Sequence, residues 1–111
     1  MPFFDLESRP ALRPVPGVTL RAVWGERMLM SFLDLEPNAE IPTHSHPHEQ
    51  VGVGLSGVFA LTIGEETRHI RPGDPYCIPS GVPHRAVALA EGARALDVFS
   101  PPREDYQKET P

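Results

Sequence analysis

Short apolar segments alternate with turn-forming residues through most of the chain. Residues 19–24 and 28–35 are rich in apolar residues and flank Gly25-Glu26-Arg27, a pattern that predicts a β-hairpin. Further strands of this kind are predicted at residues 50–55, 58–63, 67–70, 75–78, 84–89 and 93–99, with turns at Ser56-Gly57, Gly64-Glu65-Glu66 and Glu91-Gly92. Because apolar residues do not recur at helical spacing, these eight or nine short strands predict an all-β sandwich or barrel.

Two of the predicted strands differ in the size of their alternating residues. In residues 58–63 the large side chains of Phe59, Leu61 and Ile63 share one face. In residues 50–55 the alternate positions are Gly52 and Gly54, which indicates a sharp bend or a close approach of another part of the backbone.

Composition supports the β prediction and limits the size of the fold. The chain has 111 residues, which is enough for one domain, and 14 of them are prolines. An interior proline costs a helix about 3 kcal/mol, so an all-α bundle is excluded. We expect an irregular N-terminal arm at 1–17, a barrel at 18–100, and a C-terminal loop and tail at 101–111.

Charge and segment composition narrow the classes of partner. The net charge of -5 disfavours nucleic acid as a partner. Apolar runs fall far short of the ~20 residues of a membrane span, and the N-terminus lacks the pattern of a signal peptide. The one cysteine, Cys77, cannot form an internal disulfide, and we interpret it as a small core residue. These features together predict a cytoplasmic protein.

Histidines concentrate in one short segment. His44, His46 and His48 lie within five residues, and neutral imidazole is the commonest metal ligand in proteins. On an extended segment His44 and His46 point to the same side, so one divalent ion could bind both, although two surface histidines would give the same spacing. We interpret His48, which follows Pro47, as a neighbour of the ligands or an exposed residue, and His69 as a solvated strand residue.

Two longer stretches place histidines in an ordered context. Residues 38–57 read N-AEIPT-HSH-PHE-Q-VGVGLS-G, and residues 73–88 read G-DPYCI-P-S-G-VP-H-RAV-A. Their spacing resembles, at every position, the cupin superfamily motifs G(X)5HXH(X)3-4E(X)6G and G(X)5PXG(X)2H(X)3N. Asn38, Gln50 and Ala88 replace the first glycine, the glutamate and the final asparagine of the motifs. The resemblance implies a small antiparallel jelly-roll barrel that binds a metal ion through His44, His46, Gln50 and His84.

The glutamine at position 50 changes the charge of such a site. Three imidazoles and one amide are neutral, so a divalent ion would keep its full charge, favour anionic substrates and stabilise an enolate. This donor set could hold Ni, Zn, Co, Mn or Fe. Because an amide is a poor acid or base, proton transfer needs another residue.

Alternation in residues 93–99 supplies a candidate for that residue. Asp97 shares one face with Ala95 and Phe99, in the middle of an apolar strand. A buried carboxylate needs a partner, and a nearby metal ion would provide one. The alternative is that Asp97 faces solvent on an outer sheet. On pattern alone, Phe99 is more typical of a core residue than of a substrate contact.

An arginine follows the same strand. Pro101-Pro102 ends the strand stiffly, and from a short rigid loop Arg103 could reach back over the mouth of a barrel. Its planar guanidinium suits a carboxylate ligand. A solvated arginine in the tail is the alternative interpretation.

The stretches HSHPHEQVGVGLSG, RPGDPYCIPSGVPH and ALDVFSPPREDY carry a narrower resemblance. They are similar to the small pectin-degradation cupins, which open 4,5-unsaturated monouronates from pectin or alginate to linear keto sugar acids. The similarity runs from about Met28 to Tyr106. It implies a metal set at His44, His46, Gln50 and His84, and catalytic roles for Asp97, Phe99 and Arg103.

The narrower resemblance leads to one expected function with two alternatives. We expect a metal-dependent enzyme that ketonises a small anionic sugar acid, without nucleic acid or membrane partners. A homodimer is expected by the same resemblance, with Phe3 and Phe4 as candidate contacts. The alternatives are a cupin dioxygenase with a redox metal such as iron, and a non-enzymatic cupin that binds a small molecule.

Overall fold

The computed structural model describes residues 3–108, so residues 1–2 of the expected arm and 109–111 of the expected tail lie outside the described residues. This part of the chain forms seven strands and two short 3₁₀ helices. They are η1 (Leu6–Ser8), β1 (Val18–Trp24), β2 (Leu29–Leu35), β3 (Glu40–His44), β4 (Glu49–Ile63), β5 (Glu66–Ile70), β6 (Pro75–Ile78), β7 (His84–Ser100) and η2 (Glu104–Tyr106). No helix among residues 3–108 has the length and apolar content needed to cross a membrane. The prediction of an all-β fold is confirmed.

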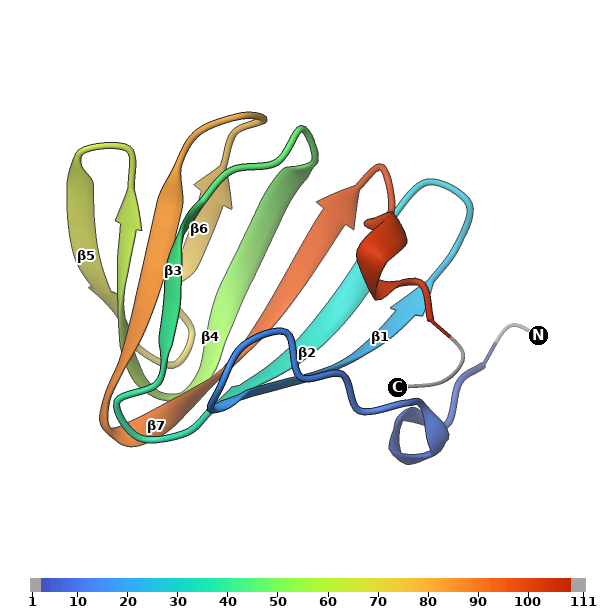
Figure 1. The fold of residues 1–111 in the computed structure, drawn as a ribbon, viewed down its shortest axis with the longest axis horizontal. Helices are drawn as coiled ribbons and strands as arrows, with labels where there is room; N and C mark the ends of the chain where they lie inside the picture. The colour runs from blue at the N-terminus through green and yellow to red at the C-terminus, as the bar shows by residue number, and fades with distance from the viewer. Residues whose placement is uncertain (1–2, 109–111) are drawn as a thin grey trace.

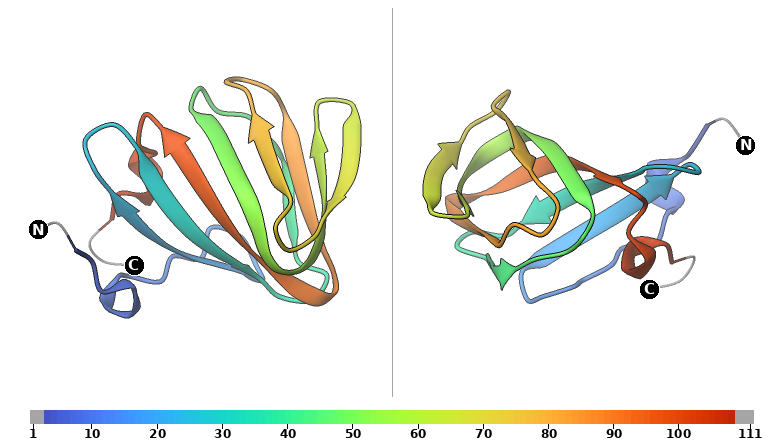
Figure 2. Two further views of the ribbon diagram at one scale, coloured as in Figure 1. Left: turned by 180° about the vertical axis from the view of Figure 1, so that it is seen from behind. Right: turned by 90° about the horizontal axis from the view of Figure 1, so that it is seen from above.

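The seven strands form one continuous hydrogen-bonded sheet, and the long strands β4 and β7 run through both walls of the barrel into which it folds. In one wall the first half of β4 pairs with the second half of β7, β6 pairs with β4, β2 pairs with β7, and β1 pairs with β2. In the other wall the remaining halves of β4 and β7 pair with each other and with β5 and β3. Figure 1 shows the strands spreading from the bend of β4 and β7, and the view from above in Figure 2 shows β1 and β2 extending from one side of the ring. All pairings are antiparallel, as expected of a jelly roll.

The predicted turns at Ser56-Gly57 and Glu91-Gly92 are wrong, because both strands continue through these residues. Gly57 and Gly92 have φ values of 66° and 75°, which a glycine adopts without strain. The register of β4 against β7 shifts around Gly57, and a Cβ there would collide with the carbonyl oxygen of Gly92. The two glycines therefore allow a bulged bend in paired strands where the sequence pattern indicated turns.

The apolar core lies inside the barrel. Phe59, Leu61 and Ile63 share one face of β4, as predicted, and this face packs into the core, with Phe59 and Leu61 buried and Ile63 partly buried. Cys77 is exposed, so its interpretation as a core residue is wrong. Alternation turns its neighbour Tyr76 inward to pack against the core.

Candidate functional site

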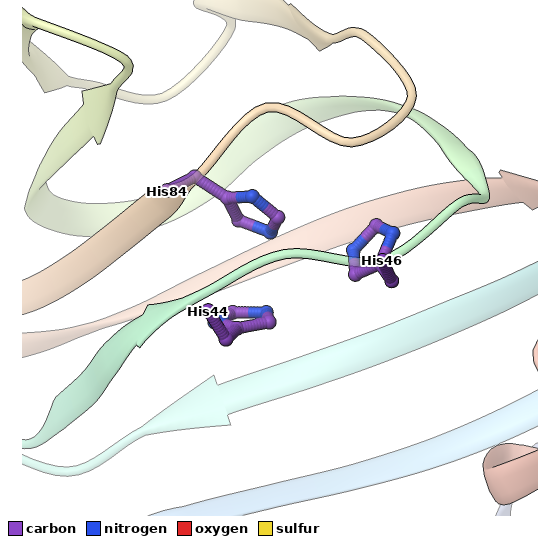
Figure 3. A group of neighbouring side chains, drawn as sticks. All are labelled: His44, His46 and His84. Atoms are coloured by element: carbon purple, nitrogen blue, oxygen red, sulfur yellow. The ribbon is translucent and has the colours of Figure 1, made fainter.

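Three histidines, from β3, the loop after it and the adjacent strand β7, converge at one end of the barrel. His44 ends β3 and pairs in register with His84, the first residue of β7, while His46 follows two residues after His44. The ring centroid of His84 lies 4.2 Å from that of His44 and 4.9 Å from that of His46. One nitrogen from each ring lies within 4.8 Å of the others, and Figure 3 shows the three side chains around a common space. The three residues could hold a metal ion.

Backbone carbonyl groups fix the proton on the outer nitrogen of each ring. The Nδ1 atoms of His44, His46 and His84 lie 2.9, 3.0 and 2.9 Å from the carbonyl oxygens of Pro42, His48 and Val82. A carbonyl oxygen only accepts, so each Nδ1–H donates and each neutral ring keeps its lone pair on Nε2. Three lone pairs are therefore directed by contacts that the loop backbone itself provides.

The inner nitrogen of His84 fits a metal ligand. Within residues 3–108 its Nε2 atom is buried and has no hydrogen-bond partner. Burial, together with the neighbouring His44, His46 and Arg103, lowers the pKa of His84 to about 4, and the hydrogen bond to Val82 opposes the change. A ring that is neutral at pH 7 and has an unpaired buried lone pair is suited to bind a cation.

The contact between His46 and Gln50 also favours a bound cation. The Nε2 atom of His46 lies 3.1 Å from Oε1 of Gln50, and the side chain of Gln50 also hydrogen-bonds Asp97. Because Asp97 accepts the amide hydrogen, the amide oxygen of Gln50 faces a His46 nitrogen that is itself an acceptor. Burial and the charge of Arg103 lower the pKa of His46, so protonation of the ring does not relieve this contact at pH 7. Two facing lone pairs form a stable arrangement when a cation lies against both.

Asp97 is inside the barrel, 3% exposed, and not on the outer surface. The hydroxyl of Tyr76 donates to its Oδ1 atom over 2.6 Å. Burial raises the pKa of Asp97, while hydrogen bonds from Tyr76 and Gln50 and the charge of Arg103 oppose the rise. Burial and the neighbouring Asp97 also raise the pKa of Tyr76, so its hydroxyl stays a donor. A carboxylate with a raised pKa that is held by two donors is well suited to accept a proton.

Gly52 makes the Tyr76–Asp97 contact possible. It lies on β4 between Tyr76 on β6 and Asp97 on β7, in register with both. A Cβ at this position would collide with Oδ1 of Asp97 and lie 2.5 Å from the Tyr76 hydroxyl oxygen. The close approach expected at this glycine is thus one of side chains, whereas Gly54 approaches the backbone carbonyl of Arg71.

Arg103 lies over the same region, held by its own loop. Its guanidinium carbon lies 4.0 Å from the ring centroid of Tyr106 and 5.1 Å from that of Phe99. Its Nε and Nη2 atoms donate to Asp105 over 3.1 and 2.7 Å. The side chain is 13% exposed, so it is not a solvated tail arginine. The guanidinium edge that was expected to bind a ligand donates to Asp105 instead. Among the described contacts, Nη1 makes no hydrogen bond and can donate to a ligand.

The remaining histidines have separate surroundings. His48 is buried and its Nε2 atom lies 3.0 Å from Oε1 of Glu104 in η2. This contact ties the histidine-bearing loop to the segment that carries Arg103. His69 is exposed on β5, as predicted.

A cavity of about 320 Å³ lies beside the histidine cluster. Its polar lining includes His44, Gln50, Asp97, Arg103, Thr43 and Ser31, and its apolar lining includes Val15, Val18, Leu33 and Ile41. The structure brings His44, His46, Gln50, His84 and Asp97 together, with Phe99 behind His46 and under Arg103. Sequence reasoning missed Tyr76, Tyr106 and Ser31. Only Ser31 carried a usable signal, as a polar residue inside the apolar alternation of residues 29–35.

Similarity to known proteins agrees with this geometry. A family model described as Cupin domain matches residues 31–99. The pectin degradation protein KdgF of Dickeya dadantii (strain 3937) is 31% identical over 84 residues, which are 75% of this chain and 76% of that protein.

Two solved structures extend the similarity to most of the chain. KdgF from Halomonas sp. has a TM-score of 0.85 at 28% identity, covering 93% of this chain and 96% of that one. An RmlC-like cupin from Shewanella frigidimarina NCIMB 400 has a TM-score of 0.88 at 25% identity, covering 96% of both chains. With a family model that spans more than half of its length and includes the three converging histidines, this protein belongs to the cupin family.

Proposed function

We propose that this cupin catalyses the ring opening and ketonisation of a 4,5-unsaturated monouronate, with one divalent transition metal ion held by His44, His46, Gln50 and His84. The observation that carries the proposal is the neutral donor set beside a buried carboxylate, Asp97, at a cavity that His44, Gln50 and Asp97 line. Similarity to a protein named for pectin degradation supports the class of substrate.

The donors suit Ni, Zn, Co, Mn or Fe, and their neutrality favours an anionic ligand. When bound, the ion supplies Lewis acidity, which stabilises negative charge on a substrate oxygen. The role of Gln50 is twofold, because its oxygen faces the donor set while its amide hydrogen holds Asp97.

Asp97 performs the proton transfers in this proposal. Its carboxylate removes the proton of the anomeric hydroxyl, the C1–O5 bond breaks, and an aldehyde and an enolate form. The carboxyl group then returns the proton to C4, so C5 becomes a ketone and the product is an isomer of the substrate. The hydrogen bond from Tyr76 fixes the carboxylate through both transfers.

Arg103 and Phe99 bind and enclose the sugar acid. Arg103 donates from Nη1 to the substrate carboxylate, while Asp105 and the Tyr106 ring hold the guanidinium in place. Phe99 gives the site an apolar wall behind His46, which excludes water from the transfers.

The test is a direct assay of the metal-loaded protein with an unsaturated monouronate. Loss of the ultraviolet absorbance of the C4=C5 bond should exceed the rate in buffer. Asp97→Asn should lower turnover by roughly 10²- to 10⁴-fold with metal content retained, the usual effect of losing a general acid or base. If Asp97→Asn turns over as the parent does, the assignment of the base fails.

The same assay distinguishes the alternative functions. A dioxygenase would consume oxygen with iron bound, and a binding module would bind the acid without turnover. Either result would overturn the ketonisation proposal.

We also propose that the protein pairs with a second copy through the N-terminal arm. Phe3 and Phe4 are exposed aromatic side chains, and such residues are enriched at interfaces. Replacing both with serine should shift the mass measured by light scattering from dimer to monomer. An unchanged mass would exclude the arm as the contact.

A further inference from the structure

Ser31 is a buried hydroxyl group that the proposed chemistry does not use. It lies in the middle of β2, where the inward positions on either side are Leu29 and Leu33. The residue is 2% exposed, and its side chain makes no hydrogen bond among residues 3–108. Its Oγ is not one of the fully buried unpaired atoms, and the residue lines the cavity, so the hydroxyl faces the cavity. A polar group that faces a cavity without a protein partner needs an explanation.

The surroundings of Ser31 supply that explanation. Ser31 pairs in register with Asp97 on the adjacent strand β7, so both side chains stand on the same face of the sheet. Both residues line the cavity of about 320 Å³ that also contains His44, Gln50 and Arg103. An apolar residue at position 31 would bury more apolar area, whereas a hydroxyl gains only if something in the cavity pairs with it.

We infer that Ser31 is a specificity-determining residue, whose hydroxyl hydrogen-bonds a hydroxyl group of a polyhydroxylated acid bound beside Asp97. The inference rests on the proposed function and names a feature of its substrate: hydroxyl groups on the ring, in addition to the carboxylate. An acid without hydroxyl groups would leave the Ser31 hydroxyl without a partner in the filled cavity, and polar groups left unpaired on binding are the strongest basis for discrimination.

Two probes of matched shape test the inference by binding alone. D-galacturonate has the ring, carboxylate and hydroxyl groups but no C4=C5 bond, and tetrahydropyran-2-carboxylate has the ring and carboxylate without hydroxyl groups. Calorimetry with the full Zn²⁺-loaded chain should show tighter binding of galacturonate. Ser31→Ala should weaken the binding of galacturonate about three- to tenfold, which is the effect of one hydrogen bond, and should leave the binding of the other acid unchanged.

A stability measurement separates a ligand-binding hydroxyl from a structural one. Because the hydroxyl has no protein partner, Ser31→Ala without ligand should melt at the same temperature as the parent or higher. Ser56→Ala, an exposed serine on β4, is the matched control and should change neither affinity nor melting temperature.

Several outcomes would overturn the inference. For Ser31→Ala, they are a lower melting temperature with an equal loss of affinity for both acids, or an unchanged affinity for galacturonate. For the parent protein, they are equal affinity for the two acids, or binding of neither acid. Failure of the proposed function looks different: the parent binds galacturonate through Ser31 but does not convert the unsaturated uronate. That result would leave the role of Ser31 intact.

Discussion

The two halves of β4 place opposite kinds of residue inside the barrel. In the second half Phe59 and Leu61 are buried in the core, as hydrophobic burial favours. In the first half the inward positions are Gln50 and Gly52, while Val51 on the outer face is largely exposed. The inward side of β4 changes from even to odd positions across the bulges between Gly54 and Phe59, and the strand buries apolar residues at one end and polar or small ones at the other.

The reversal shows what selects residues at the site. Gln50 is inside because its amide connects the histidine cluster to Asp97, and Gly52 is there because a side chain would separate Asp97 from Tyr76. Neither residue contributes much apolar burial. The second half of β4 should therefore govern stability, and the first half with its neighbours should govern metal and ligand binding.

Substitutions of the histidines should separate metal binding from stability most clearly. Replacing His44 and His46 together with alanine should abolish metal binding and activity, because two converging donors are lost. The metal-free variant should unfold at the same denaturant concentration as the metal-free parent, since the barrel has its own core. Elemental analysis measures the metal, and His69→Ala, on an exposed strand, should retain it.

The second half of β4 should show the reverse pattern. Phe59→Ala should lower the free energy of unfolding by about 3–5 kcal/mol through the cavity it leaves. Metal content of the folded variant should be unchanged. Val51→Ala, in the first half but on the outer face, should change stability by less than about 0.5 kcal/mol in the same denaturant titration. Equal losses from the two substitutions would remove the distinction between the halves.

Gly52→Ala should lower both stability and turnover, because Gly52 lies where the core meets the site. The added Cβ would force Asp97 and Tyr76 apart and cost about 1–3 kcal/mol of stability by overpacking. Turnover should fall with it, because the carboxylate loses the donor that fixes it. Gly25→Ala is the matched control, since nothing lies within 4 Å of a Cβ there. Full activity in Gly52→Ala would show that the Tyr76 contact is dispensable.

The smallest effect is expected from Gln50→Glu, which changes charge at constant size. One added negative charge should weaken binding of an anionic acid by roughly tenfold while metal binding holds or tightens. Calorimetry at a fixed metal concentration measures the affinity for the acid. An affinity equal to that of the parent protein would contradict the charge argument.

The strand pattern predicted most of this fold, and its errors have two causes. Alternation placed β1, β2, β5 and β6 within one or two residues of their observed bounds. Gly57 and Gly92 were assigned to turns because turns and bulges both use a glycine with positive φ, and only pairing with a distant strand distinguishes them. β3 was not predicted, since its positions are mostly exposed and include Pro42.

For the candidate site, the local spacing of residues was informative, whereas contacts between distant residues and side-chain rotamers could not be predicted. The spacing of His44 and His46 follows from the extended backbone, and the motif resemblance added Gln50 and His84. In contrast, His48 contacts Glu104 from 56 positions away, and the occupation of Arg103 by Asp105 depends on side-chain rotamers. No local pattern encodes such contacts. The hydrogen bond of Tyr76 to Asp97 was hidden for the same reason, although Gly52 pointed to a close approach.

The central place of β7 has a consequence for how the chain folds. β7 pairs with β2, β3 and β4, all of which precede it, and its pairing with β2 joins Leu29 to Phe99. Such distant partners carry a large loop-closure entropy, so folding should be slow for a chain of this size. During synthesis only the β1–β2, β4–β5 and β4–β6 pairs can form before β7 leaves the ribosome. The histidine cluster, which needs His84 at the start of β7, is therefore among the last features of the molecule to assemble.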